Sequence, residues 1–264
     1  MTARDTVEVG PRALRRAPAP ARAAAGPAAS GSAWNTLVAT AAEPYRKVGH
    51  FAFGFARGKL RLDPVFRAIL EQDLLEGCES VLDLGCGQAL LAAWLQSAER
   101  CHHSGLWPKG WPAPRARAVR GIELMGREVA RGRRALGAAL NVLQGDIRST
   151  EFGCADAVIV LDVMHYMSRQ SQVETLRRIR AALSAGGLLL MRVGDADSGM
   201  RFHVTRWMDR LIMLVRGHGW FSTHCRPVPE WRALLGECGF DSSEPRWMSR
   251  GTPFANVLLV ARAR

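Results

Sequence analysis

Short apolar runs alternate with amphipathic stretches of helical period along most of the chain. Five of the apolar runs have the length of a strand and are predicted as strands: residues 80–84, 118–123, 141–144, 156–161 and 187–193. Apolar residues at helical spacing fall between them, at about 88–98, 126–138 and 170–184. Strands that alternate with helices build a parallel sheet covered on both faces, so the pattern predicts a doubly wound, Rossmann-like α/β fold.

The end of the chain departs from this alternation. Two further strands are predicted at about 244–249 and 255–262, after a helix near 229–238. They are separated only by a short turn around Gly251-Thr252-Pro253, so we expect them to pair as a hairpin. The whole prediction is a seven-stranded sheet, mostly parallel, whose last strand is antiparallel.

The pattern also divides the chain into regions. Residues 1–33 are Ala, Pro, Arg, Gly and Ser with few large apolar side chains, and we predict a disordered tail there. Residues 34–77 are predicted as an N-terminal helical cap, in which Asp63-Pro64 begins a helix. Residues 78–264 are predicted as the main domain.

Two insertions interrupt the main domain. Residues 101–117 join a helix to a strand, so this loop is expected at the amino-terminal edge of the sheet and in a structural role. The insertion at about 194–228 follows the fifth strand and therefore opens on the ligand edge. Its apolar residues recur at helical spacing, which indicates either a helix packed on the core or, as we favour, a helical lid.

Charge adds a possible partner class to this picture. The formal net charge of +12 is typical of proteins that bind a nucleic acid, an acidic lipid surface, a phosphorylated substrate or an acidic carrier protein. The basic residues lie all along the chain, so solvated surface is an equal explanation. No apolar run reaches the roughly 20 residues of a membrane span, and the predicted location is cytoplasmic.

The six cysteines do not indicate a metal site. None forms a Cys-x-x-Cys pair, which favours free thiols in a reducing compartment. Cys101-His102-His103 and His224-Cys225 place possible ligands next to each other in sequence, but adjacent side chains rarely converge on one ion. We predict no metal.

The turn after the first predicted strand carries the most specific chemistry. Gly85 and Gly87 let the backbone approach a ligand closely, and the following helix points free N–H groups at the same place. A dinucleotide-binding turn would have a third glycine at position 90, which is Leu90 here. Asp83 at the strand end would repel a pyrophosphate and attract a cation, so we infer a ligand that carries an ammonium group.

Four motifs in order now resemble the class I S-adenosylmethionine-dependent methyltransferases. They are the stretches 81–87, 121–123, 144–147 and 155–162. The resemblance covers nearly all of residues 45–264 and implies S-adenosylmethionine as cofactor. It implies roles for the following residues: Asp83, Gly85 and Gly87 at the methionine part, Glu123 at the ribose hydroxyls, Asp146 and Ile147 at the adenine, and Leu161 and Asp162 in the loop that faces the methyl group.

Several of these residues have a simpler explanation. Glu123 could be a surface acid, Asp146 a turn former, and Asp162 a cap of the next helix. In related enzymes an N-terminal helix closes over the cofactor and supplies a tyrosine or a cation to its carboxylate. Tyr45 and Lys59 are the candidates for that role, although solvated side chains explain them equally well.

Methyl transfer to a hydroxyl or an activated carbon acid is helped by a general base, and histidine is the usual residue near neutral pH. His165 follows the fourth strand, in the loop that faces the methyl group, and is predicted as a base or as a substrate-orienting group. A structural role is an equal alternative. His224, in the second insertion, is a weaker candidate, and His203 is weaker still.

The same loop limits the classes of acceptor that we expect. Position 161–164 reads Leu-Asp-Val-Met and lacks the Asp/Asn-Pro-Pro-aromatic run of enzymes that methylate nucleobases. What remains resembles the small-molecule branch, with phenolic, polyketide or fatty acyl acceptors. Residues 45–66 and the Trp-Pro loop at 107–112 resemble methyltransferases of bacterial aryl-polyene pathways, which implies a carrier-bound acceptor and an acidic acyl carrier protein as partner. The alternatives are an RNA methyltransferase that uses the basic surface, and a non-catalytic cofactor-binding protein.

Overall fold

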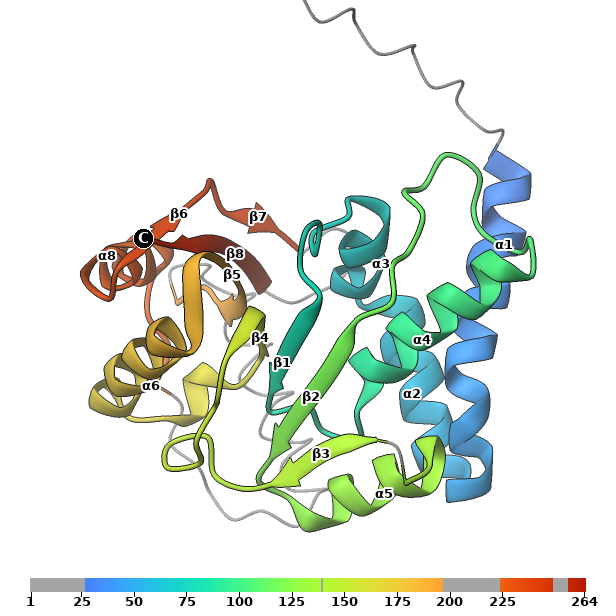
Figure 1. The fold of residues 1–264 in the computed structure, drawn as a ribbon, viewed down its shortest axis with the longest axis horizontal. Helices are drawn as coiled ribbons and strands as arrows, with labels where there is room; N and C mark the ends of the chain where they lie inside the picture. The colour runs from blue at the N-terminus through green and yellow to red at the C-terminus, as the bar shows by residue number, and fades with distance from the viewer. Residues whose placement is uncertain (1–26, 139, 197–223, 249–255) are drawn as a thin grey trace, which may run out of the picture.

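The computed structural model describes residues 27–138, 140–196, 224–248 and 256–264 (Figure 1). Within the described residues, three α-helices and one 3-10 helix precede β1: α1 (Pro27–Ala42), η1 (Glu43–Val48), α2 (His50–Leu62) and α3 (Pro64–Glu71). The strands are β1 (Ser80–Leu84), β2 (Ala118–Glu123), β3 (Asn141–Gln144), β4 (Ala155–Leu161), β5 (Leu183–Gly194), β6 (Phe240–Ser242), β7 (Arg246–Trp247) and β8 (Asn256–Ala263). The helices between and after them are α4 (Leu90–His103), α5 (Gly126–Leu136), η2 (Met164–Tyr166), α6 (Arg169–Ala182) and α8 (Val228–Glu237).

The strands form one sheet in the order β3-β2-β1-β4-β5-β8-β6, with β7 beside β8. The five strands β1 to β5 are parallel to one another, and β8 runs antiparallel to β5. This confirms the doubly wound prediction and its antiparallel last strand. The predicted hairpin is present as the short pair Arg246–Leu258 and Trp247–Val257. The described sheet has eight strands rather than seven, because β6 adds a short strand at the edge.

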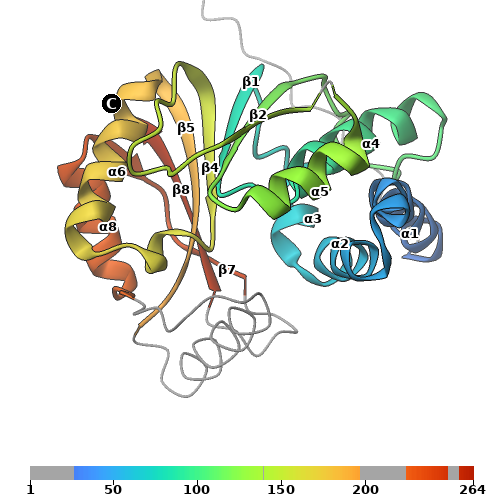
Figure 2. The ribbon, with the colours of Figure 1, turned by 90° about the horizontal axis from the view of Figure 1, so that it is seen from below.

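The two faces of the sheet have separate cores. Figure 2 shows the sheet nearly edge-on, with α6 and α8 on one face and α1 to α5 on the other. Alternate residues of each central strand enter opposite cores: Ile159 of β4 packs toward the N-terminal helices, and Val158 and Val160 pack toward α6 and α8. Because both faces are covered, the central strands are apolar throughout, as the sequence pattern indicated.

The sheet topology gathers the predicted functional residues at one edge. The carboxyl ends of β1, β2 and β4 lead directly into the glycine turn at 85–87, into Glu123 and into Asp162. In an open α/β sheet, this is the edge where ligands bind. A site built from these three loops is therefore a consequence of the strand order.

The N-terminal cap is longer than predicted. Helix α1 begins at Pro27, inside the segment that we expected to be a disordered tail, and it continues without a break through the expected boundary at residue 33. Alanine-rich composition explains the difference, because alanine has the highest helix propensity and α1 packs on α4. Residues 1–26 lie outside the described residues.

The two insertions differ in how much of them is described. Most of the predicted lid, together with His203, lies outside the described residues. Its two ends lie side by side, where Asp195 pairs with Arg226 in an isolated bridge and the Asp195 carboxylate accepts from the Val228 N–H at 3.2 Å.

The other insertion packs on the cap. The indole rings of Trp107 and Trp111 lie 5.7 Å apart, and Trp111 lies 6.0 Å from Trp34 of α1. Trp34 in turn contacts Trp94 of α4 at 5.4 Å, edge to face. These tryptophans thus link the loop at 101–117 to the cap. None of the described helices is long and apolar enough to cross a membrane.

Candidate functional site

The glycine turn after β1 has the backbone conformation that the sequence required. Gly85 and Gly87 have φ values of 76° and 56°, in the left-handed region that favours glycine. A Cβ on Gly85 would lie 2.4 Å from Cγ2 of Val163, so this position touches the loop after β4 with no room for a side chain. At Gly87 a Cβ would meet no protein atom within 4 Å. Gly87 therefore faces open space at the ligand edge.

Glu123 at the end of β2 is held by the turn itself. Its side chain is buried, and its two oxygens accept from the N–H groups of Gly87 at 2.8 Å and Met125 at 2.9 Å. This geometry excludes the alternative of a free surface acid. The carboxylate lies between the first and second strand ends, where the predicted ribose hydroxyls would be bound.

Asp83 differs from its neighbours because it has no partner among the described residues. The side chain is 6% exposed, and within the described part of the chain no hydrogen bond or ion pair reaches its carboxylate. Burial and then the nearby Glu123 carboxylate raise the pKa of Asp83 to about 7. A buried acid without a cation is costly, and an ammonium group from a ligand would remove that cost. The residues at this edge therefore fit the methionine part of S-adenosylmethionine.

In the turn after β3, the Asp146 side chain is bonded to another residue of the same turn. The Asp146 carboxylate accepts from the Arg148 backbone N–H at 2.9 Å and pairs with its guanidinium at 2.6 Å, which lowers the pKa of Asp146. Ile147 is buried and packs in the core beneath α6. Both residues lie in the loop that follows β3, one strand away from Glu123. Their predicted contact with the adenine remains a prediction.

Tyr45 and Lys59 have other partners in this structure. The Tyr45 hydroxyl is fully buried and donates to the Gln88 carbonyl at 2.8 Å, while the Gln88 side chain donates to the Ala52 carbonyl at 3.1 Å. Tyr45 thus supports the glycine turn from the cap. Lys59 pairs with Asp63 at 2.9 Å and with Asp162 at 3.3 Å. To reach a cofactor carboxylate, Lys59 would have to leave one of these acids.

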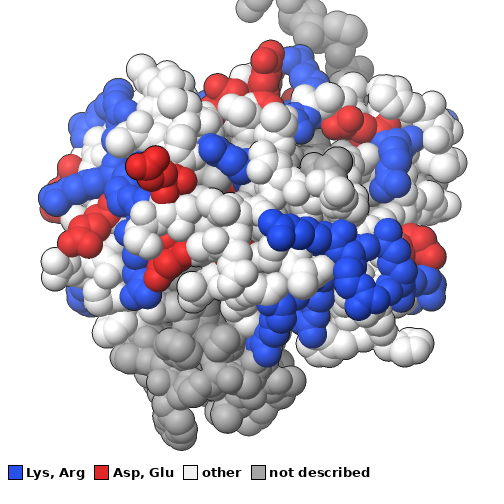
Figure 3. All heavy atoms as spheres, turned by 60° about the horizontal axis from the view of Figure 1, so that its bottom comes forward, with Lys and Arg blue, Asp and Glu red and all other residues white. Residues whose placement is uncertain are grey.

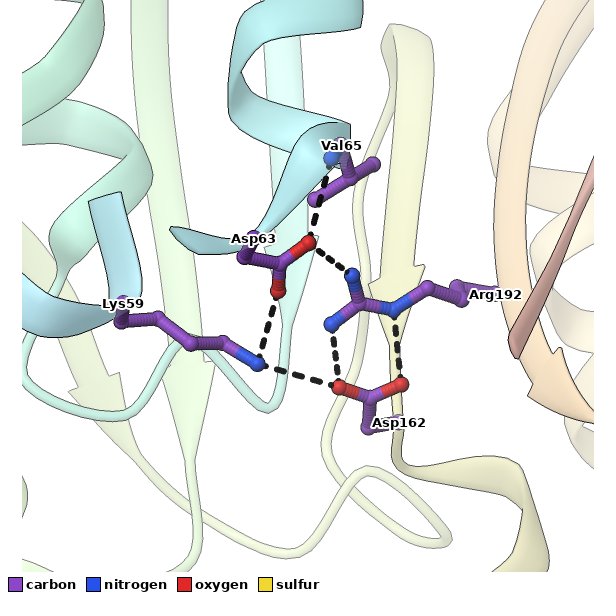
Figure 4. A network of polar contacts seen from close by, with 5 residues as sticks. All are labelled: Lys59, Asp63, Val65, Asp162 and Arg192. Carbon is purple, nitrogen blue, oxygen red and sulfur yellow. Dashed lines mark hydrogen bonds and ion pairs between the residues drawn. The ribbon is translucent and has the colours of Figure 1, made fainter. Parts of the chain in front are cut away.

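Asp162 belongs to a network of four charged side chains (Figure 4). It follows Leu161, the last residue of β4, and has a φ of 60°. Arg192 of β5 donates through Nε to Oδ1 of Asp162 at 2.7 Å and through Nη2 to Oδ2. The same guanidinium reaches Asp63, the residue that caps α3 by accepting from the Val65 N–H at 3.1 Å. These partners lower the pKa of Asp162 despite its burial.

His165 lies three residues further along the same loop and is 6% exposed. Burial, assisted by the Arg192 charge and opposed by the Asp162 carboxylate, lowers the pKa of His165 to about 4. The imidazole is therefore neutral near pH 7 and able to accept a proton. His224 lies close along the backbone, because its N–H donates to the His165 carbonyl at 2.8 Å. The structure thus brings the two candidate histidines together.

Two residues of this edge were not found from the sequence. Arg192 is a charged residue within the apolar run 188–193, and such a residue in a covered strand must be paired. Gln88 follows the glycine turn, and nothing in its type indicated that the cap would bind it. No group of three or more possible metal ligands occurs among the described residues.

The comparisons with known proteins agree with this geometry. Residues 128–241 match the family model of the O-methyltransferase domain, a range that runs from α5 to β6 and includes Asp146, Asp162 and His165. None of the curated proteins matches this sequence.

Three solved structures illustrate the shared fold. An O-methyltransferase family protein from Burkholderia thailandensis has 19% identity and a TM-score of 0.56, over 83% of this chain and 61% of its own. The pyocyanin biosynthetic protein PhzM has 18% identity and a TM-score of 0.55, over 80% of this chain and 57% of its own. The chain thus spans about three fifths of the length of these two proteins.

The third structure is similar over nearly its whole length. It is the 1,6-didemethyltoxoflavin-N1-methyltransferase of Burkholderia thailandensis with bound S-adenosylhomocysteine, at 17% identity and a TM-score of 0.53, over 94% of each chain. Residues 128–241 are thus similar to the O-methyltransferase domain, and the strand order gives the chain the fold of solved structures that include a methyltransferase with bound S-adenosylhomocysteine.

Proposed function

We propose that the protein transfers the methyl group of S-adenosylmethionine to an oxygen atom of a small organic acceptor. The observation that carries this proposal is His165: a buried, neutral imidazole in the loop after β4, within the range that matches the O-methyltransferase domain. The neutral imidazole can accept a hydrogen bond from an acceptor hydroxyl and orient it. Because the hydroxyl becomes strongly acidic as its oxygen bonds the methyl group, even an imidazole with a pKa of about 4 can then take its proton.

Each residue at the strand ends has its own role in binding the cofactor. When bound, the cofactor supplies a methyl group on a positively charged sulfur, which becomes a neutral thioether on transfer. Asp83 binds the ammonium of the amino acid part, Glu123 binds the ribose hydroxyls, and Asp146 with Ile147 contacts the adenine. Leu161 and Asp162 border the methyl group. Lys59 and Tyr45 are the candidates for the carboxylate, as the cap closes over the site.

Two histidines act on the acceptor. His165 accepts the acceptor's proton, and His224 helps to orient the acceptor.

The acceptor class that we favour is phenolic or polyketide-like. The proposal of oxygen as the acceptor atom is supported by the family model, whereas one of the similar structures is named as an N1-methyltransferase. The decisive test is incubation with methyl-labelled S-adenosylmethionine and panels of phenols, hydroxylated polyketides and heteroaromatic amines. Label in a hydroxyl-derived methyl ether supports the proposal. Label only on nitrogen, only in RNA, or in nothing while S-adenosylhomocysteine still binds would reject it.

A carrier-bound acceptor is supported by the basic side of the molecule. Figure 3 shows Lys and Arg side chains gathered on the side that carries α5. We call this the basic face; its exposed residues are Arg46, Lys47, Arg127, Arg133 and Arg134, on η1 and α5, which pack together. An acidic acyl carrier protein is the partner that we propose for this face, because opposite charges would steer it toward the cap.

The carrier proposal has its own test. The double variant Lys47→Glu/Arg134→Glu is expected to weaken binding of a recombinant acidic acyl carrier protein by about tenfold or more at low salt. Arg169→Glu/Arg177→Glu, which reverses two exposed arginines on α6, is the matched control and should change binding little. Equal losses in both variants, or tighter binding of RNA than of the carrier protein by the unmodified chain, would overturn it.

A further inference from the structure

Arg192 is the most deeply buried charged residue of the ligand edge. It lies on β5 opposite Leu161 of β4 and opposite Leu258 of β8, with a side chain that is 1% exposed. Its neighbours in sequence, Met191 and Val193, are both buried apolar residues. A guanidinium at such a position is retained only with partners for its donors.

The partners of Arg192 belong to two separate parts of the molecule. Asp162 begins the loop after β4, and Asp63 begins α3 of the N-terminal cap. In Figure 4 the planar guanidinium lies between the two carboxylates, and each of them contacts different nitrogens. The fixed fork of an arginine holds two acids at a defined distance and angle, which an ammonium group does not do.

Lys59 closes the network on its exposed side. Its amine contacts one oxygen of each acid, and its side chain is 33% exposed, compared with 1% for Arg192. Two positive and two negative groups therefore balance, and the buried half depends on Arg192. The Asp162 backbone has a left-handed φ of 60°, a conformation that is uncommon for non-glycine residues but that aspartate adopts more readily than most.

Stability alone does not explain a buried charge network, because apolar residues of similar volume are often equally stabilising. We propose that Arg192 is a positioning residue, which fixes the loop carrying His165 against the N-terminal cap through Asp162 and Asp63. The cap, which also binds the glycine turn through Tyr45 and Gln88, and the acceptor loop then move as one unit. The part of this inference that concerns His165 rests on the proposed function.

Hydrogen exchange of the free protein tests the coupling without any cofactor or acceptor. The variant Arg192→Lys keeps the positive charge but loses the planar guanidinium that binds both acids. It is expected to raise the exchange rate of backbone amides in residues 162–167 and in residues 59–66 together, by about tenfold, and to leave β4 unchanged. The matched control is Arg117→Lys: the Arg117 side chain is 3% exposed and binds the Cys78 and Leu75 carbonyls, just before β2 at the opposite edge.

A second variant separates bridging from helix capping. Asp63→Asn keeps a good N-cap for α3 and removes the charge that Arg192 binds. If the bridge couples the two regions, Asp63→Asn raises exchange in residues 162–167, although the substitution is in the cap. Unchanged exchange there, a rise in only one region for Arg192→Lys, or the same pattern in Arg117→Lys would overturn the inference. Full methyl transfer in His165→Gln would reject the proposed role of His165 while the exchange results still support the bridge, so the two proposals fail separately.

Discussion

Two aspartates at the same sheet edge have opposite surroundings. Asp83 ends β1 with no partner among the described residues and has a pKa raised to about 7, whereas Asp162 follows β4 between Arg192 and Lys59 and has a lowered pKa. The strands that carry them are neighbours in the sheet. The cations at this edge therefore pair with Asp162 and Asp63, and Asp83 is left for a ligand.

This difference separates binding from positioning. An acid without a protein partner gains the most from a cationic ligand, while a fully paired acid gains little and instead fixes a loop. The sequence alone would give both aspartates the same description, as an acid at the end of an apolar strand.

The largest expected effect comes from removing the unpaired charge. Asp83→Asn should lower the affinity for S-adenosylmethionine by about a hundredfold or more, because the ligand ammonium loses its only buried counter-charge from β1. Titration calorimetry measures this. Asp162→Asn, which loosens the loop after β4, should lower the affinity less, and Asp241→Asn on the exposed edge strand β6 is the control. Affinities that fall equally in the Asp83 and Asp162 variants would remove the distinction between the two acids.

The second largest effect is expected on turnover, when a residue of the loop after β4 is changed. His165→Gln should lower methyl transfer by about a hundredfold and leave cofactor affinity within a factor of about two. Because burial lowers the pKa of His165 to about 4, the rate should also show no acidic limb from His165 between pH 5 and 8. An essential group titrating near pH 6.5 in the rate measured at saturating S-adenosylmethionine and acceptor, where Asp83 is already paired with the cofactor ammonium, would contradict this.

Stability should depend on pH through Asp83. Its folded pKa of about 7 lies above the ordinary 3.8, so the folded state binds the proton more tightly than the unfolded state. The contribution to the free energy of unfolding is present below about pH 4 and is lost as pH rises to about 7, by up to about 4 kcal/mol. In Asp83→Asn this loss should be absent, as chemical denaturation at pH 5 and pH 8 would measure.

The smallest expected effect concerns the cap. Tyr45→Phe removes the hydroxyl that the buried Gln88 carbonyl accepts from, and should lower the free energy of unfolding by about 1 kcal/mol. The affinity for S-adenosylhomocysteine should fall no more than a few-fold, since the glycine turn keeps its bonds to Glu123. A complete loss of binding would instead return Tyr45 to the role of a direct cofactor ligand.

The fold was predictable because its determinants are local. Apolar runs, helix spacing and the Asp63-Pro64 start predicted the strands and helices to within a few residues, and the glycine turn followed from Gly85 and Gly87. The start of α1 and the short strand β6 were missed, since neither has a strong periodic pattern.

The pairing of the site residues was harder to predict from the sequence. The motifs predicted which strand ends carry acids, but the partners of Asp162 come from positions 59 and 192, which only the folded chain brings together. The same holds for Tyr45, whose contact with Gln88 spans 43 residues. Long-range polar contacts of this kind leave no periodic trace in a sequence.

The contact between Gly85 and Val163 would limit how the proposed acceptor side could change. Val163 occupies the space that any side chain at position 85 would need, so the turn after β1 and the loop after β4 meet with no layer between them. A bulkier residue at 163 would press on the backbone at 85 before it reshaped the acceptor side. We expect natural or engineered changes of specificity to arise at residues 164–167 and beyond, while position 163 stays small.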